Sequence, residues 1–315
     1  MATSNLETIA RLLVQPGKGI LASDESTPTI TKRFKAVETP STEETRRKYR
    51  EMLFTTPDLG DFISGTILFD ETIRQKAGDG TPFPELLRQR KILPGIKVDK
   101  GAKALAGFPG EKVTEGLDGL RERFAEYVEL GAHFSKWRAV VRISENLPSR
   151  TCLLVNAHAL ARFAALSQEA QIVPIVEPEV LMDGWHTLER CEEVTEAWLR
   201  LVFGQLAEHR VVLEQMLLKP NMVIAGEDCP EPAGVQEVAE ATLRCLRRSV
   251  PPAVPGIVFL SGGQPEVLAT QHLNRMNQIG GGAWQLSFSY GRALQGPALQ
   301  AWHGENVIAG HQALL

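Results

Sequence analysis

The sequence predicts a single (β/α)₈ barrel domain over residues 1–315, and three observations support this fold. Short apolar segments alternate with longer segments of amphipathic, helical periodicity, the pattern of strand–helix units in a parallel sheet. Eight such apolar segments occur, and an eight-stranded barrel commonly runs to this length. No Gly/Ser-rich or Pro-rich linker divides the chain. An open, doubly wound sheet has the same local pattern and is the alternative.

The elements follow in order from these periodicities. An amphipathic helix is expected at the N-terminus, where Leu6, Ile9, Leu12 and Leu13 recur at helical spacing. The expected strands are short apolar runs at residues 19–23, 65–69, 95–98, 133–140, 172–177, 216–219, 256–261 and 283–289. Helical spacing fills residues 42–54, 117–130, 151–166, 188–206, 235–248 and 265–276, and Ser41 is the candidate N-cap of the first of these.

Composition and charge exclude several classes of protein. Hydrophobic residues make up 43% of the chain and charged residues 23%, which provides a large core and excludes overall disorder. The net charge of −4, with acids and bases interspersed, argues against a nucleic-acid-coating or membrane-surface protein. An anionic substrate would therefore need a local cluster of positive groups.

Cysteine and histidine usage indicates a cytoplasmic protein that binds no metal. The four cysteines are scattered without a Cys-x-x-Cys pair, as expected for reduced thiols. The seven histidines show no metal-ligand spacing. No apolar run reaches membrane-spanning length, and the N-terminus lacks the apolar core of a signal peptide.

The ends of the expected strands carry the charged and hydroxyl side chains that suggest a function. In a (β/α)₈ barrel, catalytic groups come from the carboxyl ends of several strands, which open onto one face. The two-residue period of a strand places Lys136 beside Arg138, and Glu177 beside Glu179. In chain order the ends carry Asp24, Asp70, Asp99 with Lys100, Lys136 with Arg138, Glu177 with Glu179, Lys219, Ser261, and Ser289 with Arg292.

Lys219 ends a short apolar run and precedes Pro220, which stops a regular central strand. Burial disfavours the charged form of an amine, and a neutral amine beside a dry pocket attacks carbonyl carbon. Nearby Lys136 and Arg138 would raise the cost of a further ammonium and so favour the neutral form. The alternative is a strand-end lysine whose ammonium reaches water.

Attack of Lys219 on a ketone would need partners for proton transfer. The carbinolamine formed first loses water only with a proton donor, for which Glu177 is the candidate, with Glu179 shaping its titration. The resulting protonated imine withdraws electrons, so that a neighbouring carbon–carbon bond can break. Asp24 is the candidate base for the hydroxyl proton, and no metal is required. Alternatively, both glutamates form ion pairs with nearby lysines.

Two segments near the last strand ends predict a phosphate site. Ser261 and Gly262 leave one strand before an expected helix, whose free N–H groups can bind an anion. Gly291 and Arg292 follow the last strand and add a guanidinium. Barrels of this kind commonly bind phosphate in the loops after strands seven and eight. The alternative is two tight turns with an incidental arginine.

A second cluster of hydroxyls and cations follows the first strand. It contains Ser26, Thr29 and Arg33, and Lys100 could join it across the barrel mouth. These groups could hold another phosphate. A helix cap, in which the hydroxyls bond to backbone N–H groups, is an equal alternative.

Seven segments, in order and within about residues 5–303, closely resemble class I fructose-1,6-bisphosphate aldolases. They are GKGILASDEST (17–27), GIKVDKG (95–101), KWR (136–138), IVPIVEPE (172–179), LLKPNM (217–222), FLSGGQ (259–264) and FSYGRAL (288–294). The resemblance implies a cytoplasmic, metal-independent homotetramer without a cofactor, acting in glycolysis and gluconeogenesis. Its reaction would be reversible cleavage of fructose 1,6-bisphosphate into dihydroxyacetone phosphate and glyceraldehyde 3-phosphate.

The resemblance also implies a role for each matching residue. Lys219 would form the Schiff base, and Glu177 would be the acid–base group, with Glu179 and Lys136 as its charged partners. Asp24 would assist imine formation and bond cleavage. The phosphate nearest the ketone would be held by Ser261, Gly262, Gly291 and Arg292, the far phosphate by Ser26, Thr29 and Lys100, and Arg33 and Arg138 would make further substrate contacts.

Two rivals and one departure accompany this interpretation. A transaldolase-like lysine-imine enzyme is disfavoured because two phosphate clusters suit a bisphosphate, and a binding or scaffold protein on an aldolase frame is the alternative from another class. Fructose 1-phosphate is a second candidate substrate. Members of the family usually end in a tail whose last residue is Tyr, whereas the last tyrosine here is Tyr290. We therefore expect a short or missing tail and slower protonation of the bound enamine.

Overall fold

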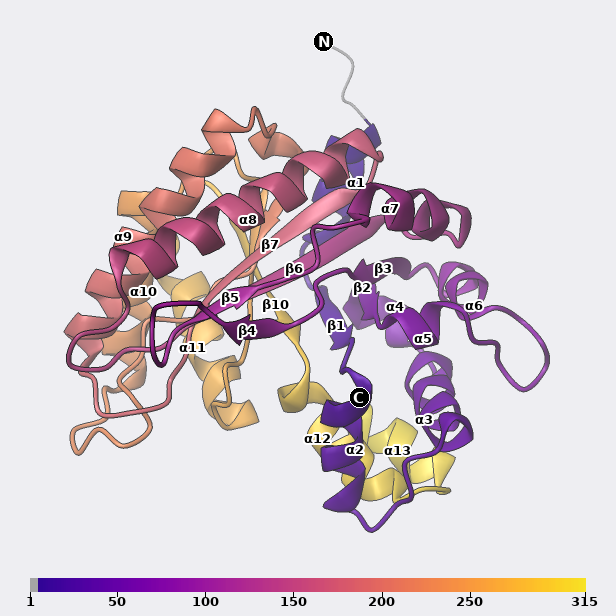
Figure 1. The fold of residues 1–315 in the computed structure, drawn as a ribbon. Coiled ribbons are helices and arrows are strands. Elements are labelled where there is room, and N and C mark those ends of the chain that lie inside the picture. Colours follow the sequence, from indigo (N-terminus) through magenta and orange to yellow (C-terminus); the bar gives the residue numbers. More distant parts are fainter. Residues whose placement is uncertain (1–4) are drawn as a thin grey trace.

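The computed structural model describes residues 5–315 and contains a closed barrel of eight parallel strands (Figure 1). Around the barrel the strands run in the order β1-β10-β9-β8-β7-β6-β3-β2. Their bounds are β1 Gly19–Ser23, β2 Ile63–Leu68, β3 Leu93–Lys97, β6 Phe134–Val141, β7 Val173–Val180, β8 Leu217–Leu218, β9 Gly256–Phe259 and β10 Gln285–Tyr290. The predicted (β/α)₈ barrel is confirmed. The open sheet is excluded, because β1 pairs with both β2 and β10.

Helices connect these strands, and all six that periodicity predicts between strands are present with shifted ends. The predicted helices are α3 Glu43–Thr55, α7 Leu120–Glu129, α8 Arg150–Glu169, α9 Leu188–Glu208, α10 Val235–Ser249 and α11 Glu266–Ile279. The additional ones are α2 Thr27–Lys35, α4 Leu59–Phe62, α5 Asp70–Ile73, α6 Phe83–Gln89, α12 Arg292–Trp302 and α13 Val307–Leu314, with the short helix η1 Leu213–Gln215 and a hairpin of β4 Ala102–Ala104 and β5 Lys112–Thr114. Two helices that were not predicted, α2 and α6, have proline as their second residue. Proline interrupts a helical sequence pattern but fits the first helical turn.

Most predicted strand ends are displaced by one to three residues, and three predicted boundaries differ for identifiable reasons. Thr42, rather than Ser41, caps α3, because its hydroxyl accepts a hydrogen bond from the backbone N–H of Thr45. Strand β7 continues past its predicted end at Glu177 to Val180, since its backbone stays paired with β6 through Val141. Strand β8 ends before Lys219 and is only two residues long.

The barrel interior is filled with apolar side chains and closed at one end by α1 Asn5–Leu13, which confirms the predicted N-terminal helix. Leu6, Ile9 and Leu13 pack onto inward-facing strand residues, whereas Leu12 is exposed. Phe134 crosses the interior beside Gly95, where an added Cβ would lie 2.3 Å from its ring. The sequence predicts that this helix starts near Met1. Met1 and the next three residues lie outside the described residues.

At the opposite end of the barrel from α1, helices α2, α3, α12 and α13 gather (Figure 1). Three aromatic rings join the first three of these helices: Phe34 lies edge-on to Tyr49 at 5.5 Å, and Trp302 lies 5.1 Å from Tyr49. This packing fixes α2, which begins directly after the end of β1, against the mouth of the barrel. Within residues 5–315, no helix is both long enough and apolar enough to cross a membrane.

Candidate active site

A cavity of about 680 Å³ opens at the carboxyl ends of the barrel strands. Strands β1, β3, β6, β7, β8, β9 and β10 or the loops directly after them contribute to it, because parallel strands point their carboxyl ends the same way. Nearly all the residues predicted for the site line this cavity. They are Asp24, Ser26, Thr29, Arg33, Lys136, Arg138, Glu177, Glu179, Lys219, Ser261, Gly262, Gly291 and Arg292.

Lys219 is buried at the base of this cavity. Only 3% of the residue is exposed, which excludes a lysine that extends its ammonium into water. Its Nζ lies 3.1 Å from Oε1 of Glu177, and its backbone N–H donates to the carbonyl of Val176 at 2.8 Å. The amine is therefore held beside one carboxylate, with its carbon stem packed in the barrel.

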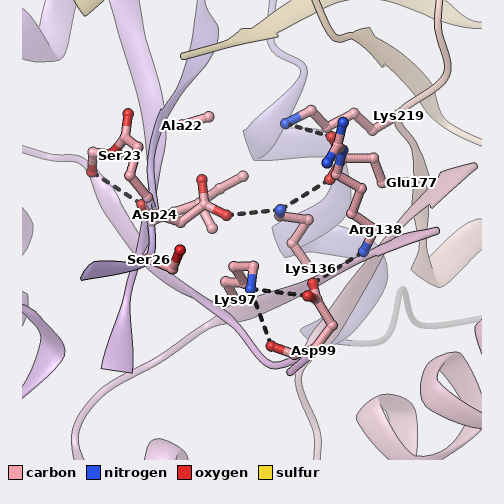
Figure 2. A network of polar contacts seen from close by, with 12 residues as sticks. Ala22, Ser23, Asp24, Ser26, Lys97, Asp99, Lys136, Arg138, Glu177 and Lys219 are labelled. Carbon is pink, nitrogen blue, oxygen red and sulfur yellow. Dashed lines mark hydrogen bonds and ion pairs between the residues drawn. The ribbon is translucent and has the colours of Figure 1, made fainter. Parts of the chain in front are cut away.

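Lys136 joins the two candidate carboxylates. Its Nζ lies 2.7 Å from Oδ2 of Asp24 and 3.0 Å from Oε2 of Glu177. Asp24, Lys136, Glu177 and Lys219 thus form one continuous chain of alternating charge, which Figure 2 shows from close by. All four side chains are almost fully buried, so their mutual interactions are screened less than those of surface pairs.

The charges of this chain are set by burial and by the partners. Burial raises the pKa of Glu177, but Lys136, Lys219 and Arg138 together lower it further, so the pKa lies below its ordinary value. The pKa of Asp24 is raised by burial and lowered much more by Lys136 and Lys219. Burial lowers the pKa of Lys136, and Asp24 and Glu177 raise it by more. Both carboxylates are therefore ionised and Lys136 is charged at neutral pH.

The cations beside Lys219 each have a carboxylate partner. The sequence predicts Lys136 and Arg138 as positive neighbours that disfavour a second ammonium. The structure adds their counter-charges, since Lys136 pairs with Glu177 and Arg138 donates from Nε to Glu179. Ion pairing of the glutamates and a place in the cavity are thus not alternatives, because both occur together.

One side of the cavity is suited to an anion. Gly262 and Gly263 adopt positive φ angles of 64° and 99°, a conformation that side chains other than glycine rarely adopt. A Cβ at Gly263 would lie 3.0 Å from Nη2 of Arg292, so the backbone approaches this guanidinium closely. Ser289 also lines the cavity, and its buried hydroxyl has no hydrogen-bond partner within residues 5–315. Backbone N–H groups and Arg292 can bind a phosphate here.

The cluster at the start of α2 forms a second polar wall. Ser26 is the N-cap residue of α2, but its hydroxyl makes no capping bond and instead lies 3.1 Å from that of Thr29. Arg33, one turn further along α2, pairs with Glu25 and still lines the cavity. A purely structural cap therefore does not account for these hydroxyls, which face the cavity together.

Comparisons with known proteins identify the family. A family model described as fructose-bisphosphate aldolase class-I matches residues 5–315. The chain belongs to the class I fructose-bisphosphate aldolases. It is a carbon–carbon lyase, and enzymes of this class act on phosphorylated sugars through a lysine Schiff base.

Individual relatives agree with this assignment. A protein named "Probable fructose-bisphosphate aldolase class 1" from Xanthomonas campestris pv. campestris is 61% identical over 96% of this chain and 90% of its own length. The fructose-bisphosphate aldolase of Dictyostelium discoideum is 52% identical over 97% of this chain and 87% of its own. The Plasmodium falciparum aldolase, solved in complex with TRAP and a small-molecule inhibitor, superposes with a TM-score of 0.97 at 50% identity, covering 98% of this chain and 90% of that one.

Two sequence predictions about the aldolase cavity are not matched by the geometry. Lys100 is exposed and is not among the lining residues, whereas Lys97 lines the cavity and lies 2.9 Å from Oδ1 of Asp99. Lys97 ends β3, where it pairs in register with Lys136 of β6. Strand alternation could have identified Lys97 from the sequence, because Lys97 and Asp99 are two residues apart and therefore share a face.

Asp70 also lies outside the aldolase cavity, although it follows the second strand as predicted. It is the first residue of α5, and its Oδ1 accepts hydrogen bonds from Nη2 of Arg74 at 2.9 Å and from the hydroxyl of Tyr127 at 2.8 Å. A helix that begins directly at the strand end carries this carboxylate to the outer layer of helices. Its charge stabilises the α5–α7 contact instead of the site.

Acidification is expected to remove stability that Asp24 and Glu177 contribute. A carboxylate with a depressed native pKa stabilises the fold fully above its ordinary pKa, here 3.8 for Asp24 and 4.5 for Glu177, and loses this contribution as the pH falls through the native pKa. Urea denaturation should therefore show Asp24→Asn to be less stable than wild type at pH 7, with a difference that narrows below about pH 4. A difference independent of pH would contradict this.

Proposed function

We propose that Lys219 is the Schiff-base nucleophile for fructose 1,6-bisphosphate and that Glu177 transfers the protons. The observation that carries this proposal is the 3.1 Å distance between Lys219 Nζ and Glu177 Oε1 inside the buried cavity. Ionised Glu177 takes a proton from the Lys219 ammonium, and the neutral amine then attacks the ketone carbon. Glu177 returns that proton to the carbinolamine oxygen, which leaves as water.

Asp24 and Lys136 assist the cleavage step. The protonated imine draws the electron pair of the bond between the third and fourth sugar carbons and becomes an enamine. The hydroxyl on the fourth carbon loses its proton to ionised Asp24 and becomes the aldehyde of glyceraldehyde 3-phosphate. Lys136 stays charged, 2.7 Å from Asp24, and stabilises negative charge that develops on the oxygen. Protonation and hydrolysis of the enamine release dihydroxyacetone phosphate.

The two polar walls of the cavity support a substrate with two phosphates. Ser261, Gly262, Gly291 and Arg292 would hold the phosphate nearest the ketone. Ser26, Thr29 and Arg33, with Lys97 in place of Lys100, would hold the far phosphate, and Arg138 would contact the sugar between them. The cations at the two ends offset the overall negative charge of the chain where an anion must bind.

Trapping with borohydride tests the nucleophile directly. Dihydroxyacetone phosphate and sodium borohydride should reduce the imine to a stable secondary amine, and peptide mass analysis should place the added mass on Lys219. An adduct on another lysine, or none at all, would disprove the assignment. Protein denatured before the addition of dihydroxyacetone phosphate serves as the control for nonspecific reaction.

Removing Arg292 should weaken binding more than chemistry. Loss of one charge-assisted contact to a phosphate costs about 1.5–3 kcal/mol, so Arg292→Ala should lower kcat/KM roughly 10- to 100-fold, mostly through KM. Steady-state kinetics with fructose 1,6-bisphosphate measure this. Arg121→Ala, on the outer face of α7, is the control. Equal effects of the two substitutions would contradict a phosphate contact at Arg292.

We also propose that the enzyme is a cytoplasmic homotetramer, as members of the family typically are. The scattered cysteines, which form no disulfide within residues 5–315, are compatible with a reducing compartment. Light scattering coupled to size-exclusion chromatography would measure the mass of the assembly. A monomer at micromolar concentration would contradict the proposed tetramer.

A further inference from the structure

Backbone pairing between β7 and β8 stops at the proposed nucleophile. The last hydrogen bond of this ladder runs from the N–H of Lys219 to the carbonyl of Val176. In a parallel ladder the next donor, toward the carbonyl of Lys219, is the N–H of residue 178. That residue is proline and has no N–H, so this hydrogen bond cannot form. The strand that carries Glu177 is therefore not joined to the segment beyond Lys219 by backbone.

The side chain of Asn221 occupies this gap. Its Oδ1 accepts a hydrogen bond of 2.9 Å from the backbone N–H of Val180, the next donor on the same edge of β7 after Pro178. Its Nδ2 donates to the carbonyl of Met222 at 3.0 Å and to the hydroxyl of Thr195 on α9 at 3.3 Å. Asn221 is 5% exposed, so every polar atom of this buried amide is used within the chain.

We infer that Asn221 is a positioning residue that holds Lys219 at reacting distance from Glu177. The amide replaces the missing backbone ladder beyond Lys219 and joins residue 221 to β7, which carries Glu177 and Glu179. On the other edge, the N–H of Leu260 donates to the carbonyl of Pro220 at 3.1 Å, so the segment stays attached to β9 when the amide is removed. The segment after Lys219 is then released from β7, whereas the bond from the N–H of Lys219 to the carbonyl of Val176 remains. This inference rests on the proposed role of Lys219.

The expected effect follows from the sensitivity of proton transfer to geometry. A displacement of about 1 Å between reacting groups can cost roughly 100-fold in rate. Asn221→Ala should therefore slow imine formation with dihydroxyacetone phosphate about 10- to 100-fold, measured as the rate of borohydride-trapped adduct on Lys219. KM for fructose 1,6-bisphosphate should change less than about threefold, since the phosphate-binding groups lie on other elements.

A matched control separates positioning from general loosening. The Thr242 hydroxyl accepts a hydrogen bond of 2.9 Å from the backbone N–H of Val223, two residues beyond Asn221, and is equally buried. Thr242→Val removes a side chain–backbone bond of the same kind without touching β7. It should lower the thermal unfolding temperature comparably and leave imine formation within about twofold of wild type. Equal slowing in both variants would overturn the inference.

A milder variant keeps the test decisive if Asn221→Ala does not fold. Thr195→Val is isosteric and removes the outer contact that orients the amide, together with a contact of the Thr195 hydroxyl with Cys191, so it should slow imine formation about two- to fivefold. If wild type traps at Lys219 and neither variant slows this step, the role of Asn221 is wrong while the proposed function stands. If wild type does not trap at Lys219, the proposed nucleophile itself is wrong.

Discussion

Replacing Lys219 by Ala is expected to lower kcat for cleavage of fructose 1,6-bisphosphate by roughly 10⁴-fold or more, because no other group can form the imine. Three other lysines line the cavity. Two of them are committed to carboxylates, Lys136 to Asp24 and Glu177 and Lys97 to Asp99, and the third, Lys32, is exposed on α2. A coupled assay of triose phosphate formation measures this loss. The assay must follow rates over roughly a 10⁴-fold range, so its detection limit must lie well below about 0.1% of the wild-type rate.

Lys219→Arg is the matched control for charge. It keeps a cation beside Glu177 but lacks a nucleophilic amine, since guanidinium does not deprotonate in proteins. Both variants should be similarly inactive, while only Lys219→Ala changes the electrostatics. Lys136 still pairs with Glu177 in either case, so the variants should fold, which circular dichroism and thermal unfolding check. Cleavage by either variant at more than about 1% of the wild-type rate would rule out the imine mechanism at this residue.

Replacing Glu177 by Gln should lower kcat by about 10²- to 10⁴-fold, because Gln has the same shape but cannot carry the proton. Two steps depend on that proton: formation of the neutral amine and loss of water from the carbinolamine. We therefore expect slow borohydride trapping at Lys219 and a nearly unchanged KM for fructose 1,6-bisphosphate. Rapid-quench kinetics with dihydroxyacetone phosphate measure the trapping step directly.

Glu179→Gln provides the comparison on the same strand. Glu179 shares the face of β7 with Glu177, but its contact is with Arg138 rather than with Lys219. Its loss should reduce kcat about tenfold or less, through the orientation of Arg138 alone. If the two substitutions had equal effects on imine formation, the proton would not pass through Glu177.

The local pattern of the chain predicts the strands and most of the site. Apolar runs of strand length mark the barrel, and a residue at or directly after the end of most runs lines the cavity, as for Asp24, Lys219 and Ser261. This prediction works because strand periodicity, and the interruption of a strand or helix by proline, can be recognised within a few consecutive residues. It misses α2 and α6, whose first-turn prolines resemble breaks in a helix.

Only the folded structure decides which of two neighbouring residues lines the cavity. Residues 95–101 contain two lysines, and only the register of β3 against β6 shows that Lys97 faces the cavity while Lys100 faces solvent. Asp70 occupies a strand end like Asp24, yet the immediate start of α5 carries it outward. Strand alternation places Lys97 and Asp99 on one face but does not show that this face lines the cavity, because the register depends on β6, which is remote in sequence.

The sequence by itself determined the barrel, the family and the chemical type of nearly every cavity residue, because apolar periodicity and ordered motifs are properties of short segments. Tertiary structure alone decided which charges pair. Asp24, Lys136, Glu177 and Lys219 are far apart in the chain, and they become one buried network only because the closed barrel brings four strands, β1, β6, β7 and β8, together. The protonation states of Asp24, Lys136 and Glu177 follow from that burial and those distances, since Coulomb interactions act through space and not along the chain.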